Sequence, residues 1–172
     1  MTLALAVVLG LATGCQPEPA PSPTTPVFAS EDEAFAAAEE TYRAYVDALN
    51  QVDLSDPETF EAVYEWTTGD ANANERKTLT QMHADGWQVS GATSVTSFHG
   101  GNVELAAPAS VTATICSDVS EVQVLASTGE SVVPDERPDV YALAVEFVAS
   151  ATTDTGLAIS TSNAVEDPIC TP

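Results

Sequence analysis

Apolar residues recur at every third or fourth position between residues 31 and 50, which is the spacing of one buried helix face. The residues on this face are Phe35, Ala38, Tyr42, Tyr45, Val46 and Leu49. Just before them, Ser30 and Glu33 occupy the positions of a capping box, which satisfies free amides at the start of a helix. The pattern therefore predicts a first helix from about 31 to 50.

Two further helices are expected before residue 86. Asp56-Pro57 combines a capping residue with a proline suited to a first turn, and the helix that it opens ends near Thr68-Gly69. Its inner face would carry Phe60, Val63 and Tyr64. A third helix is predicted from about 71 to 84, where Gly86 follows as a terminator.

The second half of the chain alternates apolar and polar residues and is rich in valine and threonine, which is typical of strands. A turn is expected at Gly100-Gly101-Asn102. The predicted strands cover about 87–98, 103–116, 122–126, 140–149 and 157–163. Helices first and antiparallel strands afterwards predict an α+β domain with the helices on one face of the sheet.

The first residues follow a different pattern. Leu3 to Leu11 form an apolar run without charge, and a proline-rich stretch follows at 16–26. An apolar run, small residues and a segment that cannot pack are typical of a secretory signal, and the run is shorter than the roughly 20 residues of a membrane-spanning helix. We therefore predict a signal peptide at 1–14, a tether at 15–29 and one folded domain at 30–172.

The run Leu11-Ala12-Thr13-Gly14-Cys15 resembles the lipobox of bacterial lipoproteins. The resemblance implies that Cys15 is diacylated after the signal is cleaved, so that a lipid anchor holds the protein on the outer face of the cytoplasmic membrane. Ala12 stands where leucine is usual, and no lysine or arginine precedes the apolar run. An ordinary signal peptide with an incidental cysteine is therefore the alternative, and a start upstream of Met1 stays open.

The charge balance narrows the choice of partners. The chain has 26 acidic residues against 4 basic ones, for a net charge of -22. Nucleic-acid binding needs clustered lysine and arginine, so nucleic acid is excluded as a partner. The acidic residues show no calcium-loop spacing, and the histidines and cysteines are too few for a zinc site, so we expect no metal and no other cofactor.

Cys116 and Cys170 remain once Cys15 is assigned to the lipid. An exported protein lies in an oxidising compartment, where a remaining pair is best interpreted as a disulfide. Neither cysteine has a histidine at the spacing of a catalytic motif, so a nucleophilic thiol is not favoured. We expect the bond to tie a mid-chain strand to the C-terminus.

Several short segments carry a second resemblance, which covers about residues 31–170. They are Thr41–Tyr45, Trp66–Asp70, Met82–Trp87 with Gly91, Ile115–Ser120, Arg137 before Tyr141–Val145, and the final Cys170. Together with the order of three helices and a curved antiparallel sheet, they resemble actinobacterial surface lipoproteins with a nuclear transport factor 2-like domain. The resemblance implies an α+β cone, in which some relatives bind small apolar molecules or catalyse reactions on them.

Five aromatic residues are candidates for the lining of such a cone: Tyr42, Tyr45, Tyr64, Trp66 and Trp87. The alternative is that they are core residues, because aromatic side chains contribute much of the area of a core. Glu146 is a sixth candidate, as the one carboxylate in an otherwise apolar predicted strand. It would be a general base if its face lined the cone, but the larger residues of the strand lie on the other face, which favours an outward Glu146.

No catalytic motif stands out, and three functional classes remain. We favour a non-catalytic module of the cell envelope that binds a small apolar ligand or an envelope protein. A small isomerase- or cyclase-type enzyme is the first alternative, and it predicts a carboxylate such as Glu146 or Asp47 facing a tyrosine inside the cone. The second alternative is an accessory domain that assembles through its exposed sheet face, as a homodimer or with another chain.

Overall fold

The computed structural model describes residues 27–170, and the first predicted helix opens it as α1 (Glu31–Leu49). The expected cap is present, because Ser30 Oγ accepts from the Glu33 amide while Glu33 Oε2 accepts from the Ala29 amide. The predicted signal peptide, Cys15 and most of the predicted tether lie outside the described residues. Within the described range, no helix combines the length and the apolar character needed to cross a membrane.

The second predicted helix is shorter than expected. It consists of a 3-10 turn, η1 (Pro57–Phe60), and one turn of α-helix, α2 (Glu61–Tyr64). It ends early because the next stretch of backbone pairs with a strand: the Ile159 amide donates to Trp66 O, and the Thr68 amide donates to Ile159 O. The backbone groups that would continue the helix are thereby used in the sheet.

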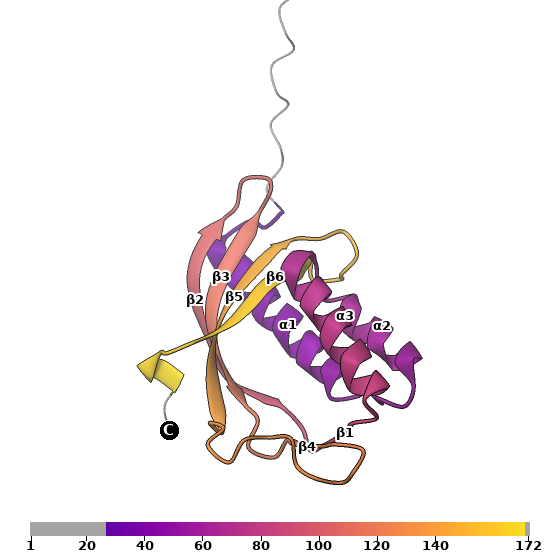
Figure 1. Cartoon of the computed structure of the whole chain (residues 1–172). Coiled ribbons are helices and arrows are strands. Elements are labelled where there is room, and N and C mark those ends of the chain that lie inside the picture. Colours follow the sequence, from indigo (N-terminus) through magenta and orange to yellow (C-terminus); the bar gives the residue numbers. More distant parts are fainter. Residues whose placement is uncertain (1–26, 171–172) are drawn as a thin grey trace, which may run out of the picture.

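The third helix, α3 (Gly69–Ala84), lies with α1 over one face of the main sheet (Figure 1). This sheet is antiparallel throughout and has the order β2-β3-β5-β6. Its strands are β2 (Ser94–Glu104), β3 (Ser110–Asp118), β5 (Val140–Ala149) and β6 (Leu157–Val165). A separate two-stranded sheet pairs β1 (Gln88–Ser90) with β4 (Gln123–Leu125). The predicted α+β architecture is confirmed.

Two clusters of buried residues hold these layers together. The first lies between α1 and the inner face of the main sheet and includes Ala34, Ala38, Tyr42, Val111, Ile115, Val145, Phe147, Leu157 and Ile159. The second joins the helices and consists of Ala48, Leu54, Phe60, Val63, Tyr64 and Leu79. Phe28, which the sequence assigns to the tether, is buried in the first cluster, so the chain is already packed before α1 begins.

The predicted turn at 100–102 is wrong, because β2 continues through it to Glu104. Gly100 packs so closely on α1 that a side-chain carbon there would come within 2.5 Å of the Phe35 ring. Gly101 approaches Thr112 of β3 in the same way, and the register shifts at this point, as in a bulge. The glycines therefore permit close packing of a bent strand rather than a reversal of the chain.

The predicted disulfide between Cys116 and Cys170 is confirmed, with 5.3 Å between the two Cα atoms. Ile115 faces the core and Cys116 follows on the opposite face of β3, where it packs with Ala142 and Cys170. The bond therefore fixes the last turn of the chain, η2 (Pro168–Cys170), on the outer face of the main sheet.

Candidate functional site

A pocket of about 320 Å³ lies at the C-terminal end of α1, opposite the end at which the chain enters the domain. The loop after α1, one face of α3 and the small β1–β4 sheet supply its lining, and Figure 1 shows β1 and β4 near the C-terminal end of α3. The lining residues are mostly apolar: Leu49, Val52, Leu54, Leu79, Met82, Val89, Gly91, Val122 and Val124, together with Asn50, Glu75, Thr78 and Thr93. A concave, mainly apolar site with a few polar groups is the usual form of a small-molecule site.

Glu75 is the ionisable residue of this lining, and it meets a tyrosine from the neighbouring helix. Tyr45 Oη donates a hydrogen bond to Glu75 Oε1 across 2.6 Å. The Tyr45 ring in turn packs against Tyr42, with 5.6 Å between ring centroids. The three side chains form a polar group that runs from the core to the wall of the pocket.

Burial shifts the protonation of all three groups. The pKa of Glu75 is raised because burial disfavours its charge, and the hydrogen bond from Tyr45 offsets part of this shift. The pKa values of Tyr45 and Tyr42 are raised by burial first and by the nearby charge of Glu75 second. The tyrosines therefore stay neutral hydrogen-bond donors across the physiological pH range.

The position of Glu75 on α3 follows from helix periodicity. Ala71 and Leu79 are buried on α3, and Glu75 lies midway between them at four-residue intervals, on the same face of the helix. The sequence could have indicated Glu75, because it is a carboxylate at a position that the helix spacing places on the buried face of α3. It was not identified from the sequence, because Ala71 and Leu79 are too few to define that face clearly.

Two hydrogen bonds join the residue that follows α1 to the residue that precedes β2, and they hold one wall of the pocket in place. Asn50 Nδ2 donates to Thr93 O, and the Thr93 amide donates back to Asn50 Oδ1, both across 2.9 Å. Gly91 separates β1 from β2 with φ of +82°, and a side-chain carbon there would come within 3.2 Å of Val122 Cα. The predicted continuous strand at 87–98 is therefore interrupted, and β1 turns away to cover the pocket.

The five predicted aromatic residues lie in the two buried clusters and do not surround one cavity. Tyr42 and Tyr45 lie beside each other, and Tyr45 reaches the pocket through Glu75. Tyr64 is buried between the helices, with the Arg76 guanidinium 3.9 Å from its ring centroid. Trp66 and Trp87 pack against the same helical cluster and border two other hollows. None of the five belongs to the lining of the pocket itself.

Glu146 does not lie in this pocket, and its side chain has the outward orientation that the larger residues on the other face of its strand favour. Val145 and Phe147 are buried in the core, and side chains alternate along a strand, so Glu146 lies on the outer face of β5. It borders a shallow hollow with threonines of β3 and β6. Asp47, the other expected carboxylate, is exposed on α1. The carboxylate that faces a tyrosine is therefore Glu75.

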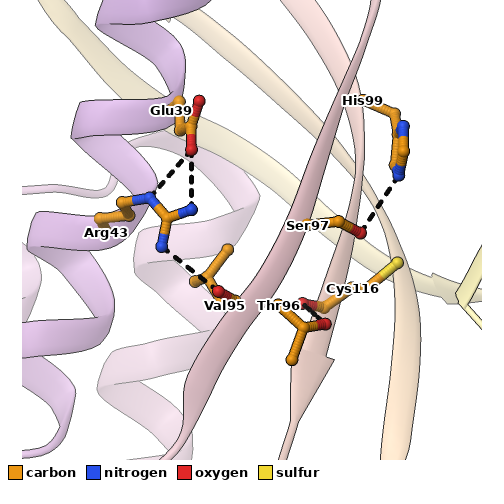
Figure 2. A network of polar contacts seen from close by, with 7 residues as sticks. All are labelled: Glu39, Arg43, Val95, Thr96, Ser97, His99 and Cys116. Carbon is orange, nitrogen blue, oxygen red and sulfur yellow. Dashed lines mark hydrogen bonds and ion pairs between the residues drawn. The ribbon is translucent and has the colours of Figure 1, made fainter.

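Three of the four basic residues are engaged by partners other than Glu75, and one of them, Arg137, bonds the backbone of the lining residue Val122. Arg43 Nε and Nη2 donate to Glu39, and Arg43 Nη1 donates to Val95 O on β2, as Figure 2 shows. Arg76 covers the Tyr64 ring, and Arg137 Nη2 donates to the carbonyls of Val119 and Val122. Among the described residues that line the pocket, none is a lysine or an arginine. Within residues 27–170, no cluster of three metal-ligating side chains occurs.

Comparisons with known proteins give a likeness at the level of fold. No family model matches the chain, and no curated protein matches it. The intermembrane-space region of the chloroplast protein ARC6 is similar with a TM-score of 0.52 at 14% identity, over 77% of this chain and 97% of that one.

Two bacterial structures are more distant. A periplasmic fragment of TraM has a TM-score of 0.49 at 9% identity, over 80% of this chain and 98% of that one. The VirB8 protein of Agrobacterium tumefaciens has a TM-score of 0.48 at 10% identity, over 80% of this chain and 95% of that one. At these identities, the ARC6 likeness indicates a shared fold and nothing about activity.

Proposed function

We propose that this protein is an extracytoplasmic, lipid-anchored module of the cell envelope that binds a small, mostly apolar molecule in the pocket beside Glu75. The observation that carries the proposal is the pocket of about 320 Å³ with its mainly apolar lining. Its volume is at the lower end of the roughly 300–1,000 Å³ that small-molecule sites occupy. A ligand of this size would bury most of its surface there.

The anchor and the fold family belong to the same proposal. The sequence before residue 27 supports lipidation at Cys15, and the order of helices and a bent antiparallel sheet supports a nuclear transport factor 2-like domain. The disulfide between Cys116 and Cys170 supports an oxidising location outside the cytoplasm. The ARC6 region that shares the fold comes from an intermembrane space, which agrees with such a location.

A thermal-shift titration with 1-octanol tests the pocket. A ligand that binds only the folded state raises the melting temperature, and the shift grows with the logarithm of the ligand concentration once this exceeds the dissociation constant. The variant Thr78→Trp would fill the pocket from α3, and Thr80→Trp, at an exposed position of the same helix outside the lining, is the matched control. We expect the wild type and Thr80→Trp to bind and Thr78→Trp not to bind. Equal binding by all three proteins would refute the pocket.

Metabolic labelling with an alkyne-bearing fatty acid tests the anchor. The full-length protein, expressed in a bacterial host that processes lipoproteins, is expected to carry the label and to sediment with membranes. Cys15→Ser is expected to lose both properties, since the thiol is the acylated group. A labelled Cys15→Ser protein, or an unlabelled wild type, would contradict the proposal.

A small enzyme is a second candidate, favoured by the contact between Tyr45 and Glu75. A carboxylate with a raised pKa in an apolar site is a suitable general base. The probe 5-nitrobenzisoxazole tests for such a base, because removal of its carbon-bound proton breaks the N–O bond and leaves a coloured phenolate. Faster ring opening than in acetate, lost in Glu75→Gln, would support the enzyme, and a rate equal to acetate would exclude a reactive base at this site.

The outer face of the main sheet offers less support for assembly. The hollow around Glu146 is shallow, and its lining mixes Thr112, Thr114, Thr161 and Asn163 with small apolar residues. This mixed lining does not point to a second copy of the chain more than to any other partner.

A further inference from the structure

We propose that the ligand of the pocket is a cationic amphiphile, whose hydrocarbon part fills the apolar end and whose protonated amine pairs with Glu75. The inference rests on the proposed binding function of this pocket and adds the chemical class of the ligand. Three observations support it. The carboxylate of Glu75 has no charged partner in the pocket lining, the lining offers apolar surface for a hydrocarbon chain, and the protein has a strongly negative net charge.

The carboxylate of Glu75 has no cationic partner among the residues around it. It is the only ionisable side chain in the described pocket lining, and it accepts a hydrogen bond from the neutral hydroxyl of Tyr45. A carboxylate in an apolar setting is costly unless a charge pairs with it. An ammonium group on the ligand would supply that charge through a short, charge-assisted hydrogen bond.

The remaining lining offers both polar and apolar contacts. Thr78 follows Glu75 on α3, where its hydroxyl can accept a second hydrogen bond from an ammonium group. Leu54, Met82, Val89 and Val124 supply the apolar surface. A ligand with one charged end and a short hydrocarbon body fits both kinds of contact.

The charge of the whole molecule favours the same sign of ligand. The net charge is -22, and the arginines are tied to Glu39, to the Tyr64 ring and to backbone carbonyls. A field of one sign attracts ligands of the opposite sign and repels those of its own. Fatty acids and other anionic amphiphiles are thereby disfavoured, although their hydrocarbon chains would fit equally well.

Calorimetric titration with three eight-carbon probes tests the inference: octylamine, 1-octanol and octanoate. We expect octylamine to bind at least about tenfold more tightly than 1-octanol, as one charge-assisted hydrogen bond provides, and octanoate to bind most weakly. In Glu75→Gln, which removes the charge but keeps an acceptor for Tyr45, octylamine should bind no more tightly than the alcohol. Glu40→Gln removes one charge from an exposed position of α1 and should keep the preference.

The outcomes separate this inference from the proposed function. If no probe binds, the pocket itself is refuted. If 1-octanol binds but octylamine has no advantage, or if Glu75→Gln keeps that advantage, the cationic ligand is refuted and the apolar pocket stands. The wild type alone gives a second test, because the advantage of octylamine should disappear on acidification as Glu75 takes up a proton. An advantage that persists below pH 4 would refute the role of Glu75 even if Glu75→Gln failed to fold.

Discussion

The ionised carboxylate of Glu75 lowers the stability of the folded protein, because it is partly buried. For an acid whose pKa is higher in the folded chain than in the unfolded chain, the folded state binds more protons between the two pKa values. Stability therefore falls as the pH rises through this interval. Burial raises the pKa of Glu75, so its contribution is unfavourable at neutral pH and vanishes below the ordinary glutamate range. Residues that oppose stability in this way are often retained for binding.

Replacing Glu75 with glutamine should stabilise the protein at pH 7. The neutral amide avoids the cost of burying a charge and can still accept from Tyr45 Oη. Chemical denaturation at pH 7 and pH 4 measures the effect, and the gain should shrink toward zero at pH 4, where the wild-type carboxyl is protonated. Glu40→Gln controls for the loss of one charge. A gain that is the same at both pH values would show that burial of the charge is not its cause.

Removing the hydroxyl of Tyr45 should have the opposite effect. Tyr45→Phe keeps the ring that packs against Tyr42 but takes the hydrogen bond from Glu75. A half-buried carboxylate without this donor should cost about 1–3 kcal/mol of the free energy of unfolding at neutral pH. Urea denaturation measures the loss, and Tyr141→Phe on β5 serves as a comparison. An unchanged stability would mean that water replaces the hydroxyl fully.

At the scale of helices and strands, the predictions were correct where several neighbouring residues indicated the same element. α1 was predicted almost to its last residue because its cap and its apolar spacing agree. The reversal at 100–102 was mispredicted because Gly-Gly-Asn is also the composition of a turn. Only the approach of the Phe35 ring, which is distant in sequence, distinguishes a bulge from a turn there.

The wall of the pocket that β1 and β4 form depends on Gly91. Its φ of +82° is unfavourable for other residues, and an added side-chain carbon would meet the backbone of Glu121 and Val122. Gly91→Ala should therefore destabilise the protein by more than Gly129→Ala, which has a similar φ of +85° in open space and should cost about 1–2 kcal/mol. Thermal or urea denaturation of both variants measures the difference. Equal losses would mean that the wall can move away from the new methyl group.

At the scale of the whole molecule, the class of fold followed from the order of elements, while the site did not. Helices in the first half and strands in the second are visible in the spacing of apolar residues. The contact between Tyr45 and Glu75 joins positions 30 residues apart, and no periodicity within either helix specifies which residues of two helices meet. Chemistry that depends on such a meeting has to be found in three dimensions.

The disulfide is the main covalent constraint on the described chain. It closes a loop with a sequence separation of 54, and loop-entropy reasoning gives about 4 kcal/mol for a loop of this length. We expect Cys116→Ala with Cys170→Ala to lower the free energy of unfolding by about 2–5 kcal/mol, measured by denaturation without reductant. Reduction of the wild type should give a comparable loss. A variant as stable as the oxidised wild type would show that packing of η2 suffices.

The chain enters the domain at one end of α1, and the pocket lies at the other end. The helix has 19 residues, so at 1.5 Å per residue it sets about 28 Å between the point where the chain enters the domain and the pocket. A surface attached at the N-terminal side of the domain, such as that of a biosensor chip, therefore lies about one helix length from the pocket. The same geometry makes N-terminal immobilisation the suitable format for screening ligand libraries against this protein.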